Sequence, residues 1–133
     1  MLARKLNDLD KEKLITHLCT LQGEDRRLRF GMITTDDYIK DYVLNSFDGQ
    51  SKWFGCEDNF DIVSACHVAI LDGQAELGCS VDSNYRGLGY AQDMFDRSVT
   101  WLRSKGITDV CMHCLAENAI MKHIARKNDM AVV

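Results

Sequence analysis

The stretch from residue 75 to residue 105 joins an alternating strand, a turn with two glycines and a long amphipathic helix. Ala75–Val81 alternates apolar and other residues, which predicts a half-buried strand. The spacing then predicts a helix to about Lys105 that ends at Gly106, and its expected inward face is made of Leu88, Ala91, Phe95, Ser98, Val99 and Leu102. A strand, a glycine-bearing turn and a helix place free backbone N–H groups at one point, which favours an anion there.

The turn between this strand and this helix is the clearest candidate for a ligand site. Gly87 and Gly89 lack a Cβ atom, so ligand atoms can approach the main chain closely. The helix that follows presents the positive end of its dipole. We therefore expect a pyrophosphate group at this turn. Gln92 occupies the position of the third glycine in a dinucleotide-binding motif, and no Gly-Lys-Ser/Thr follows, so neither a Rossmann fingerprint nor a P-loop is present.

Composition and charge narrow the class of protein. The chain has 133 residues, of which 46 % are apolar, which predicts one domain over residues 1–133 with a packed core. A net charge of −4 and a pI near 5.5 argue against a nucleic-acid partner. No apolar run approaches the ~20 residues that span a bilayer, and no signal peptide is visible. We expect a cytoplasmic protein without a membrane partner.

Six cysteines are scattered along the chain, mostly inside apolar patterns, which favours buried free thiols in a reducing compartment. Cys111 and Cys114 form a C-x-x-C pattern. A structural zinc site needs a second pair of ligands at suitable spacing, and in a strand these two side chains point to opposite faces. We therefore expect no metal. A small thiol or zinc protein stays as an alternative function, less favoured than the two that are described below.

The remaining patterns predict an α/β fold, in which a mixed sheet is flanked by helices. Gly23 is expected to end the first helix, and the charged run Glu24–Arg29 to be solvated surface. Asp72-Gly73 predicts a hairpin turn. The expected elements are a strand in 1–6, a helix from Asn7 or Asp8 to Leu21, a helix after Thr34–Asp37, strands at Lys52–Glu57, Ile62–Leu71 and Ala75–Val81, the helix to Lys105, a strand at Ile107–Leu115, a helix at Glu117–Asn128 and a strand from Met130.

The segment Arg86-x-x-Gly89-x-Ala91 resembles the Q/R-x-x-G-x-G/A signature of GNAT N-acetyltransferases. Glu24–Phe30, Ala75–Leu77 and Leu115–Met121 follow the order of similar segments in one branch of that family, the acetyltransferase domains of bacterial protein lysine acetyltransferases. The resemblance covers about residues 20–130. It implies a GNAT fold and an enzyme, an N-acetyltransferase that uses acetyl-CoA as cosubstrate. The implied acceptor is a primary amine, on a small molecule or a protein lysine.

The resemblance also assigns residues to the cofactor. In GNAT proteins the pantetheine arm pairs like an extra strand with the main chain at positions that match Cys79, Ser80 and Val81. Asn118 matches the family asparagine that bonds the pantetheine. The pyrophosphate is expected on the N–H groups of the turn, at Arg86, Gly87, Leu88, Gly89, Tyr90 and Ala91.

Glu76 is the candidate catalytic base. Strand alternation places Glu76, Gly78 and Ser80 opposite an apolar row, on a face that helices should cover. Burial raises the pKa of a carboxyl group towards values that suit a base. A base is needed because an amine with a pKa near ~10.4 is mostly protonated at neutral pH. The resemblance points to the same glutamate, while His67 and His113 are expected to line the core or the cleft.

Two features depart from the family pattern. Ala125 stands where many GNAT enzymes carry a tyrosine that acts as general acid towards the CoA thiolate. The sequence ends at Val133, before the usual C-terminal hairpin, which predicts a shortened C-terminal end. A partner subunit in a homodimer could complete the sheet, the acceptor site could be open, or the reading frame could be truncated. The competing function is a non-catalytic CoA- or acyl-CoA-binding module.

Overall fold

The computed structural model describes residues 2–112, 126–127 and 131–132. Within these residues the strands form one sheet in chain order. Neighbouring strands are antiparallel from the first to the fourth, and parallel from the fourth to the sixth. The strands are β1 (Arg4–Lys5), β2 (Lys52–Asp58), β3 (Asp61–Leu71), β4 (Gln74–Val81), β5 (Asp109–Met112) and β6 (Ala131–Val132).

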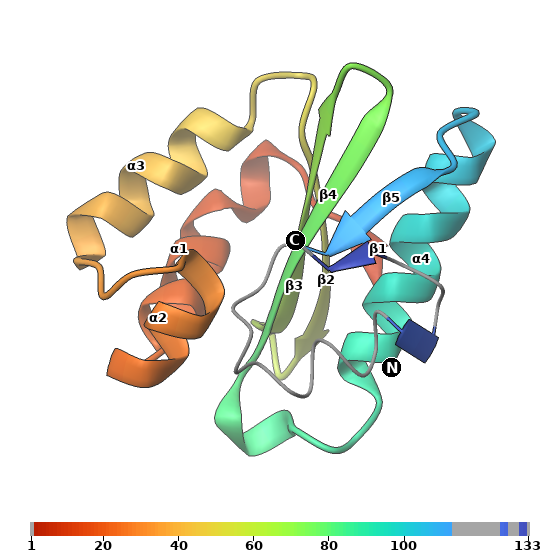
Figure 1. The fold of residues 1–133 in the computed structure, drawn as a ribbon. Coiled ribbons are helices and arrows are strands. Elements are labelled where there is room, and N and C mark those ends of the chain that lie inside the picture. Colours follow the sequence, from red (N-terminus) through yellow and green to blue (C-terminus); the bar gives the residue numbers. More distant parts are fainter. Residues whose placement is uncertain (1, 113–125, 128–130, 133) are drawn as a thin grey trace.

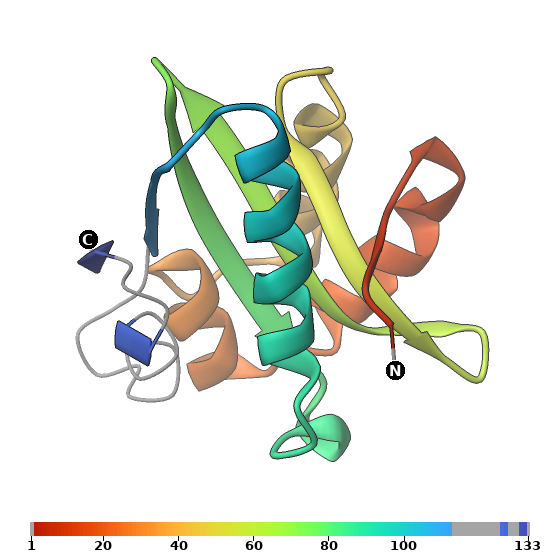
Figure 2. The same ribbon diagram turned by 90° about the vertical axis from the view of Figure 1, so that its right-hand side faces the viewer.

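Helices cover both faces of this sheet (Figure 1). On one face lie α1 (Lys11–Cys19), α2 (Gly23–Phe30) and α3 (Asp36–Ser46). On the other face α4 (Tyr90–Ser104) crosses β2, β3 and β4, as Figure 2 shows. The expected α/β fold with a mixed, helix-flanked sheet is confirmed. None of the helices within the described ranges has the length and apolar character to cross a membrane.

Apolar side chains alternate with other residues along β4, and the two faces of the sheet carry separate layers of the core. Ala75, Leu77, Cys79 and Val81 are buried in the layer beneath α4, together with Phe95. On the opposite face Leu14, Leu18, Ile39, Val43 and Trp53 form the layer beneath α1 and α3. The predicted apolar row of β4 is therefore confirmed, and its other residues face the α1–α3 layer.

Most predicted elements match the structure, and the turn at Asp72-Gly73 has the positive φ angles of a tight hairpin, 52° and 76°. Thr35 caps α3 through its side-chain oxygen, which accepts from the N–H of Tyr38 at 3.1 Å. Most of the helix expected at 117–128 lies outside the described residues.

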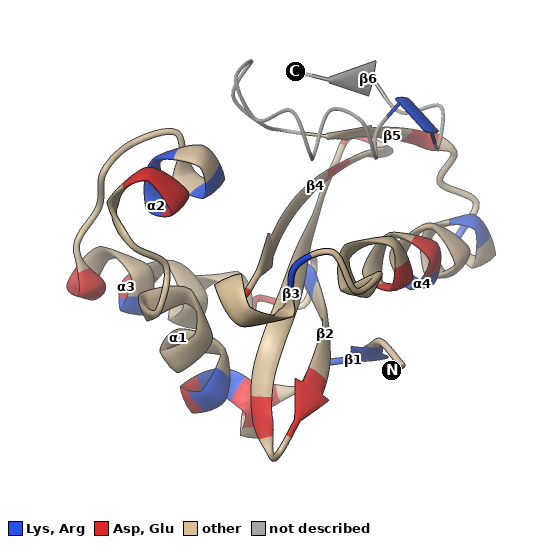
Figure 3. Cartoon of the chain, turned by 90° about the horizontal axis from the view of Figure 1, so that it is seen from below, with Lys and Arg blue, Asp and Glu red and all other residues tan. Residues whose placement is uncertain are grey.

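The segment Glu24–Arg29 lies at the surface, since α2 contains no buried residue, but it forms a helix that was not predicted. The expectation that Gly23 ends the first helix was wrong, because α1 ends at Cys19 and Gly23 begins α2. Helix α2 has acidic residues in its first turn and arginines in its last turn, so that both charges appear on it in Figure 3.

Arg26 fixes α2, because its guanidinium donates to the carbonyls of Cys19 and Leu21 at 2.9 and 2.6 Å. It also donates to the carbonyl of Thr34 at 2.9 Å. One side chain thereby joins the end of α1 to the loop before α3.

His17 connects α1 to β4 from within the core. It is 2 % exposed, and its Nε2 lies 2.8 Å from the Oγ atom of Ser80. Burial lowers the pKa of His17 to about 4, so the ring is neutral at pH 7. Burial and the nearby Arg29 cation lower the pKa of His67 on β3 to about 3.

These two histidines predict that the fold loses stability in mild acid. In the unfolded chain a histidine has a pKa of ~6.5, so the unfolded state binds more protons as the pH falls from about 6.5 towards 4. Each histidine should reduce the free energy of unfolding by roughly 2 kcal/mol between pH 7.5 and pH 5. Urea titrations of the wild type and of His17→Gln at both pH values test this. The variant should lose clearly less stability than the wild type, and an equal loss would contradict the assignment.

Candidate functional site

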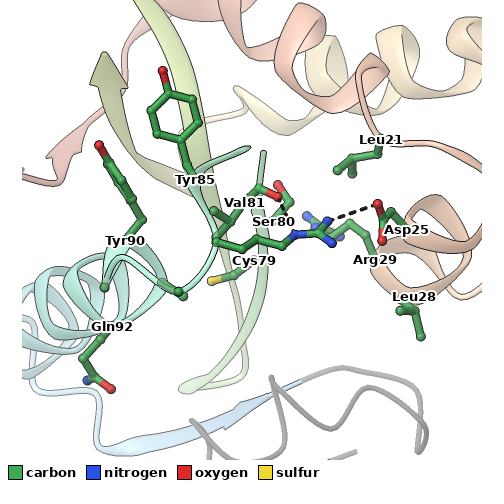
Figure 4. A pocket seen from close by; sticks show the side chains of 14 residues that line it. Leu21, Asp25, Leu28, Arg29, Cys79, Ser80, Val81, Tyr85, Tyr90 and Gln92 are labelled. Carbon is green, nitrogen blue, oxygen red and sulfur yellow. Dashed lines mark hydrogen bonds and ion pairs between the residues drawn. The ribbon is translucent and has the colours of Figure 1, made fainter. Parts of the chain in front are cut away.

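A cleft of about 270 Å³ opens between α2, the end of β4 and the start of α4 (Figure 4). Eight of the predicted cofactor-binding residues line it together, although β4 and the turn are separated along the chain from α2. They are Cys79, Ser80, Val81, Arg86, Gly87, Gly89, Tyr90 and Ala91. Leu21, Leu28 and Arg29 form the opposite wall.

The turn at the start of α4 has the backbone that an anion site requires. Gly87 and Gly89 have φ angles of 74° and 89°, a region in which an L side chain is strained. Gly89 is the N-cap of α4 and supplies no side-chain hydrogen bond to the first turn of the helix. Tyr85 anchors the turn to β2, since its hydroxyl donates to Asp58 Oδ2 at 2.7 Å. The N–H donors of this helix end therefore remain uncapped by its N-cap residue.

Arg86 places a positive charge beside these N–H groups. Its Nε donates to the carbonyl of Val81 at 3.3 Å. Its second terminal nitrogen lies 3.1 Å from Asp25 Oδ2, so this ion pair spans the cleft from the turn to α2 (Figure 4). The cleft therefore combines an uncapped helix N-terminus and an arginine at one end with apolar side chains, Leu21, Leu28 and Val81, along its wall. This donor set suits a phosphate group that carries a thin, largely apolar arm.

Of the other two predicted cofactor-binding residues only Leu88 is described, and it does not line the cleft. Leu88 lies in the turn with its side chain 57 % exposed, and it was wrong to place that side chain on the apolar face of α4. The reason is that α4 begins only at Tyr90, after two left-handed glycines. Asn118 lies outside the described residues, as do His113, Cys114 and Ala125.

Glu76 lies on the predicted face of β4 but is exposed rather than buried. Its neighbours across the sheet are Ala69 on β3 and Cys111 on β5. These short side chains cannot cover a glutamate, which explains why the expected burial is absent. Glu76 does not line the cleft described above.

Within the described ranges no group of three or more His, Cys, Asp and Glu side chains is arranged to hold a metal ion. The cysteines among these residues, Cys19, Cys56, Cys66, Cys79 and Cys111, are free thiols.

Sequence reasoning missed a polar cluster beside the cleft. Arg29 of α2 donates to the hydroxyl of Tyr42 at 3.1 Å, and that hydroxyl lies 2.7 Å from His67 Nδ1. The His67 ring stacks on Trp53 with centroids 4.6 Å apart. Neighbouring strands pair Trp53 with His67 and His67 with Gly78. A prediction of the strand register could therefore have placed these three residues side by side. No pattern in the sequence indicated that α2 would place Arg29 over them.

Comparison with known proteins agrees with this geometry. A family profile described as the acetyltransferase (GNAT) domain matches residues 4–131. No protein of curated function matches the chain in a sequence search.

Solved structures share the fold. A GNAT-family acetyltransferase from Staphylococcus aureus Mu50 has a TM-score of 0.75 at 19 % identity, covering 95 % of this chain and 81 % of that one. A predicted acetyltransferase from Clostridium acetobutylicum, solved with acetyl-CoA, has a TM-score of 0.72 at 18 % identity, covering 95 % and 86 %. The GNAT domain of S. lividans PAT has a TM-score of 0.78 at 17 % identity, covering 94 % and 78 %. At these identities the likeness shows a common fold.

The ion pair across the cleft predicts a gain of affinity when its acid is removed. In Asp25→Asn, Arg86 is free to meet an incoming phosphate and one like charge is lost. Because partly exposed pairs of this kind are weak, we expect CoA to bind about two- to fivefold more tightly. Calorimetric titration with CoA at low and high salt measures this, with Glu24→Gln on the same helix as the matched control. Unchanged or weaker binding by Asp25→Asn alone would contradict the expectation.

Proposed function

Because this chain belongs to the GNAT acetyltransferase family, we propose that it transfers an acetyl group from acetyl-CoA to a primary amine by direct attack of the amine on the thioester. The observation that carries this proposal is the cleft in which the end of β4 meets the glycine turn and the uncapped N-terminus of α4. Acetyl-CoA supplies the acyl group as an activated thioester. The protein has to hold it, orient the amine and accept a proton.

The proposed contacts follow the cleft from end to end. The N–H groups of residues 86–91 and the Arg86 guanidinium hold the pyrophosphate, while the main chain of Cys79, Ser80 and Val81 aligns the pantetheine arm. These contacts are supported by the position of the residues, because all of them except Leu88 line the cleft. The end of that cleft is rich in N–H donors. Asn118 stays a prediction of the family resemblance.

Glu76 is the proposed base. It shares a face of β4 with Gly78 and Ser80, and an exposed carboxylate can accept the proton of an amine directly or through one water. The acceptor approaches from this face in the proposal, which leaves small amines and protein lysines as candidates. We propose no nucleic-acid partner, and a homodimer stays a prediction.

The exposure of Glu76 also favours the competing function, a non-catalytic module that binds CoA or acyl-CoA. A carboxylate in water has less reason to act as a tuned base than a buried one. The two functions share the cofactor cleft and differ in whether Glu76 matters for turnover.

Calorimetric titration with acetyl-CoA, and then with CoA, tests the shared part. We expect micromolar affinity in the wild type. Gly89→Glu should abolish it, because a side chain at a φ of 89° strains the turn and its carboxylate repels the pyrophosphate. Failure of the intact protein to bind either ligand would refute the proposed function.

Glu76→Gln then separates enzyme from binding module. The change keeps the size of the side chain and removes the base, so the affinity for acetyl-CoA should stay within twofold while kcat falls by about 10²- to 10⁴-fold. Release of CoA thiol in the presence of primary amines measures turnover, with Glu24→Gln as the control. If Glu76→Gln turns over like the wild type, Glu76 is not the base.

A further inference from the structure

Arg29 lies in an unusual position for an arginine of a charged helix. Its side chain is half-buried and lines the cleft. The guanidinium carbon and its two terminal nitrogens lie 3.0, 3.1 and 3.2 Å from the point where a Cβ atom on Gly78 would be. These nearly equal distances mean that the guanidinium lies flat over Gly78. A Cβ atom on residue 78 would press against the guanidinium and displace it by a few tenths of an ångström.

The charge of Arg29 has no anionic partner in the part of the chain that is described. Aromatic rings hold it instead: the guanidinium carbon lies 4.9, 5.6 and 6.0 Å from the centres of Phe30, Tyr42 and Trp53. Its hydrogen bond goes to the neutral hydroxyl of Tyr42, and its buried Nε has no partner. Arg26 on the same helix pairs with Asp36.

A cation in such surroundings is costly unless an anion compensates it. The rings and Gly78 cover its faces, so the N–H groups along its edge are the part that can meet a ligand. An edge of planar N–H donors matches the two oxygens of a carboxylate. The missing anion is therefore best matched by a carboxylate that is brought by a ligand.

The position of this cation relative to Glu76 indicates which ligand. Glu76 and Gly78 point to the same face of β4 and are two residues apart, about 7 Å along a strand. The acceptor face thus presents a carboxylate and, beside it, a guanidinium. A molecule with an amino group and a carboxylate on the same carbon atom is complementary to both.

We propose that the acceptor is an amino acid, whose carboxylate is bound by Arg29 and whose amino group is directed towards Glu76. This inference rests on the proposed function and names its substrate class. The amine lone pair forms the C–N bond to the acetyl carbon, and the C–S bond breaks with its electron pair leaving on sulfur as the CoA thiolate. Glu76 takes one proton from the ammonium group before the attack, which frees the lone pair. The second proton, lost from nitrogen as the amide forms, passes to the CoA thiolate, so that CoA leaves as the thiol. The carboxylate on Arg29 is unchanged and fixes the orientation.

The proposal separates amino acids from other amines. The side-chain amine of a protein lysine has no carboxylate beside it, so it would leave Arg29 unpaired. A polyamine would bring a second cation towards Arg29, which is repulsive. Arg29 is therefore a specificity-determining residue in this proposal.

The test begins with binding, because binding does not require turnover. The twenty standard amino acids are titrated calorimetrically into protein saturated with CoA, which carries no acetyl group. The best ligand is then compared with its primary amide and with the amine that remains after removal of the carboxylate. We expect both analogues to bind about 10- to 100-fold more weakly than the acid. Acetylation kinetics of the three compounds should show the same order in kcat/KM, mainly through KM.

Variants connect this preference to Arg29. Arg29→Met should remove the preference for the acid over its amide, and Arg29→Lys should keep part of it as a point charge. Gly78→Ala retains the guanidinium but displaces it, so it should also weaken the preference. Arg27→Met, on the same helix, is the control and should leave the preference intact. If Arg29→Met fails to fold, two other results test the proposal. They are the ratio of the wild-type affinities for the acid and its amide, and the change of that ratio in Gly78→Ala.

Three results would overturn the proposal: equal binding of acid and amide by the wild type, binding of carboxylate-free amines but of none of the amino acids, or an unchanged preference in folded Arg29→Met. Separate titration with acetyl-CoA identifies failure of the proposed function. If acetyl-CoA does not bind, the enzyme assignment fails, while the amino-acid titration of the CoA-free protein still decides whether Arg29 binds a carboxylate.

Discussion

The alternation of β4 is the constraint on which the rest of the structure depends. Ala75, Leu77, Cys79 and Val81 must face α4, because a shift of one residue would move this apolar row out of the core. Glu76, Gly78 and Ser80 are then forced to the opposite face. That face meets His17 of α1 at Ser80 and Arg29 of α2 at Gly78. The packing on one side of the strand therefore places the polar groups on the other.

Three arginines near the cleft show how similar residues acquire different roles from their partners. Arg26 makes bonds to carbonyls and holds α2 in place. Arg86 forms an ion pair with Asp25 across the cleft and lies beside the uncapped start of α4. Arg29 has rings and a hydroxyl around it but no anion among the described residues. The sequence presents the first and the third only as members of one charged run.

These positions divide the proposed reaction between the cleft and the neighbouring face of β4. The turn and Arg86 suit the phosphates of the cofactor, while β4 carries the groups proposed to meet the acceptor. The same strand serves both ligands, since Cys79–Val81 lines the cleft and Glu76 lies just before it. A short separation between donor and acceptor sites is what direct transfer between two bound ligands needs.

The sequence by itself determined the strands, the hairpin at Asp72-Gly73, α4 and the glycine turn, because local periodicity and glycine conformation decide those features. Its motif also indicated the family. Tertiary structure decided that Glu24–Arg29 is a helix, that Glu76 is exposed and that Arg29 lies over Gly78. The burial of a charged side chain depends on neighbours from distant segments, such as Tyr42 and Trp53 around Arg29, and local pattern carries no information about which segments will meet.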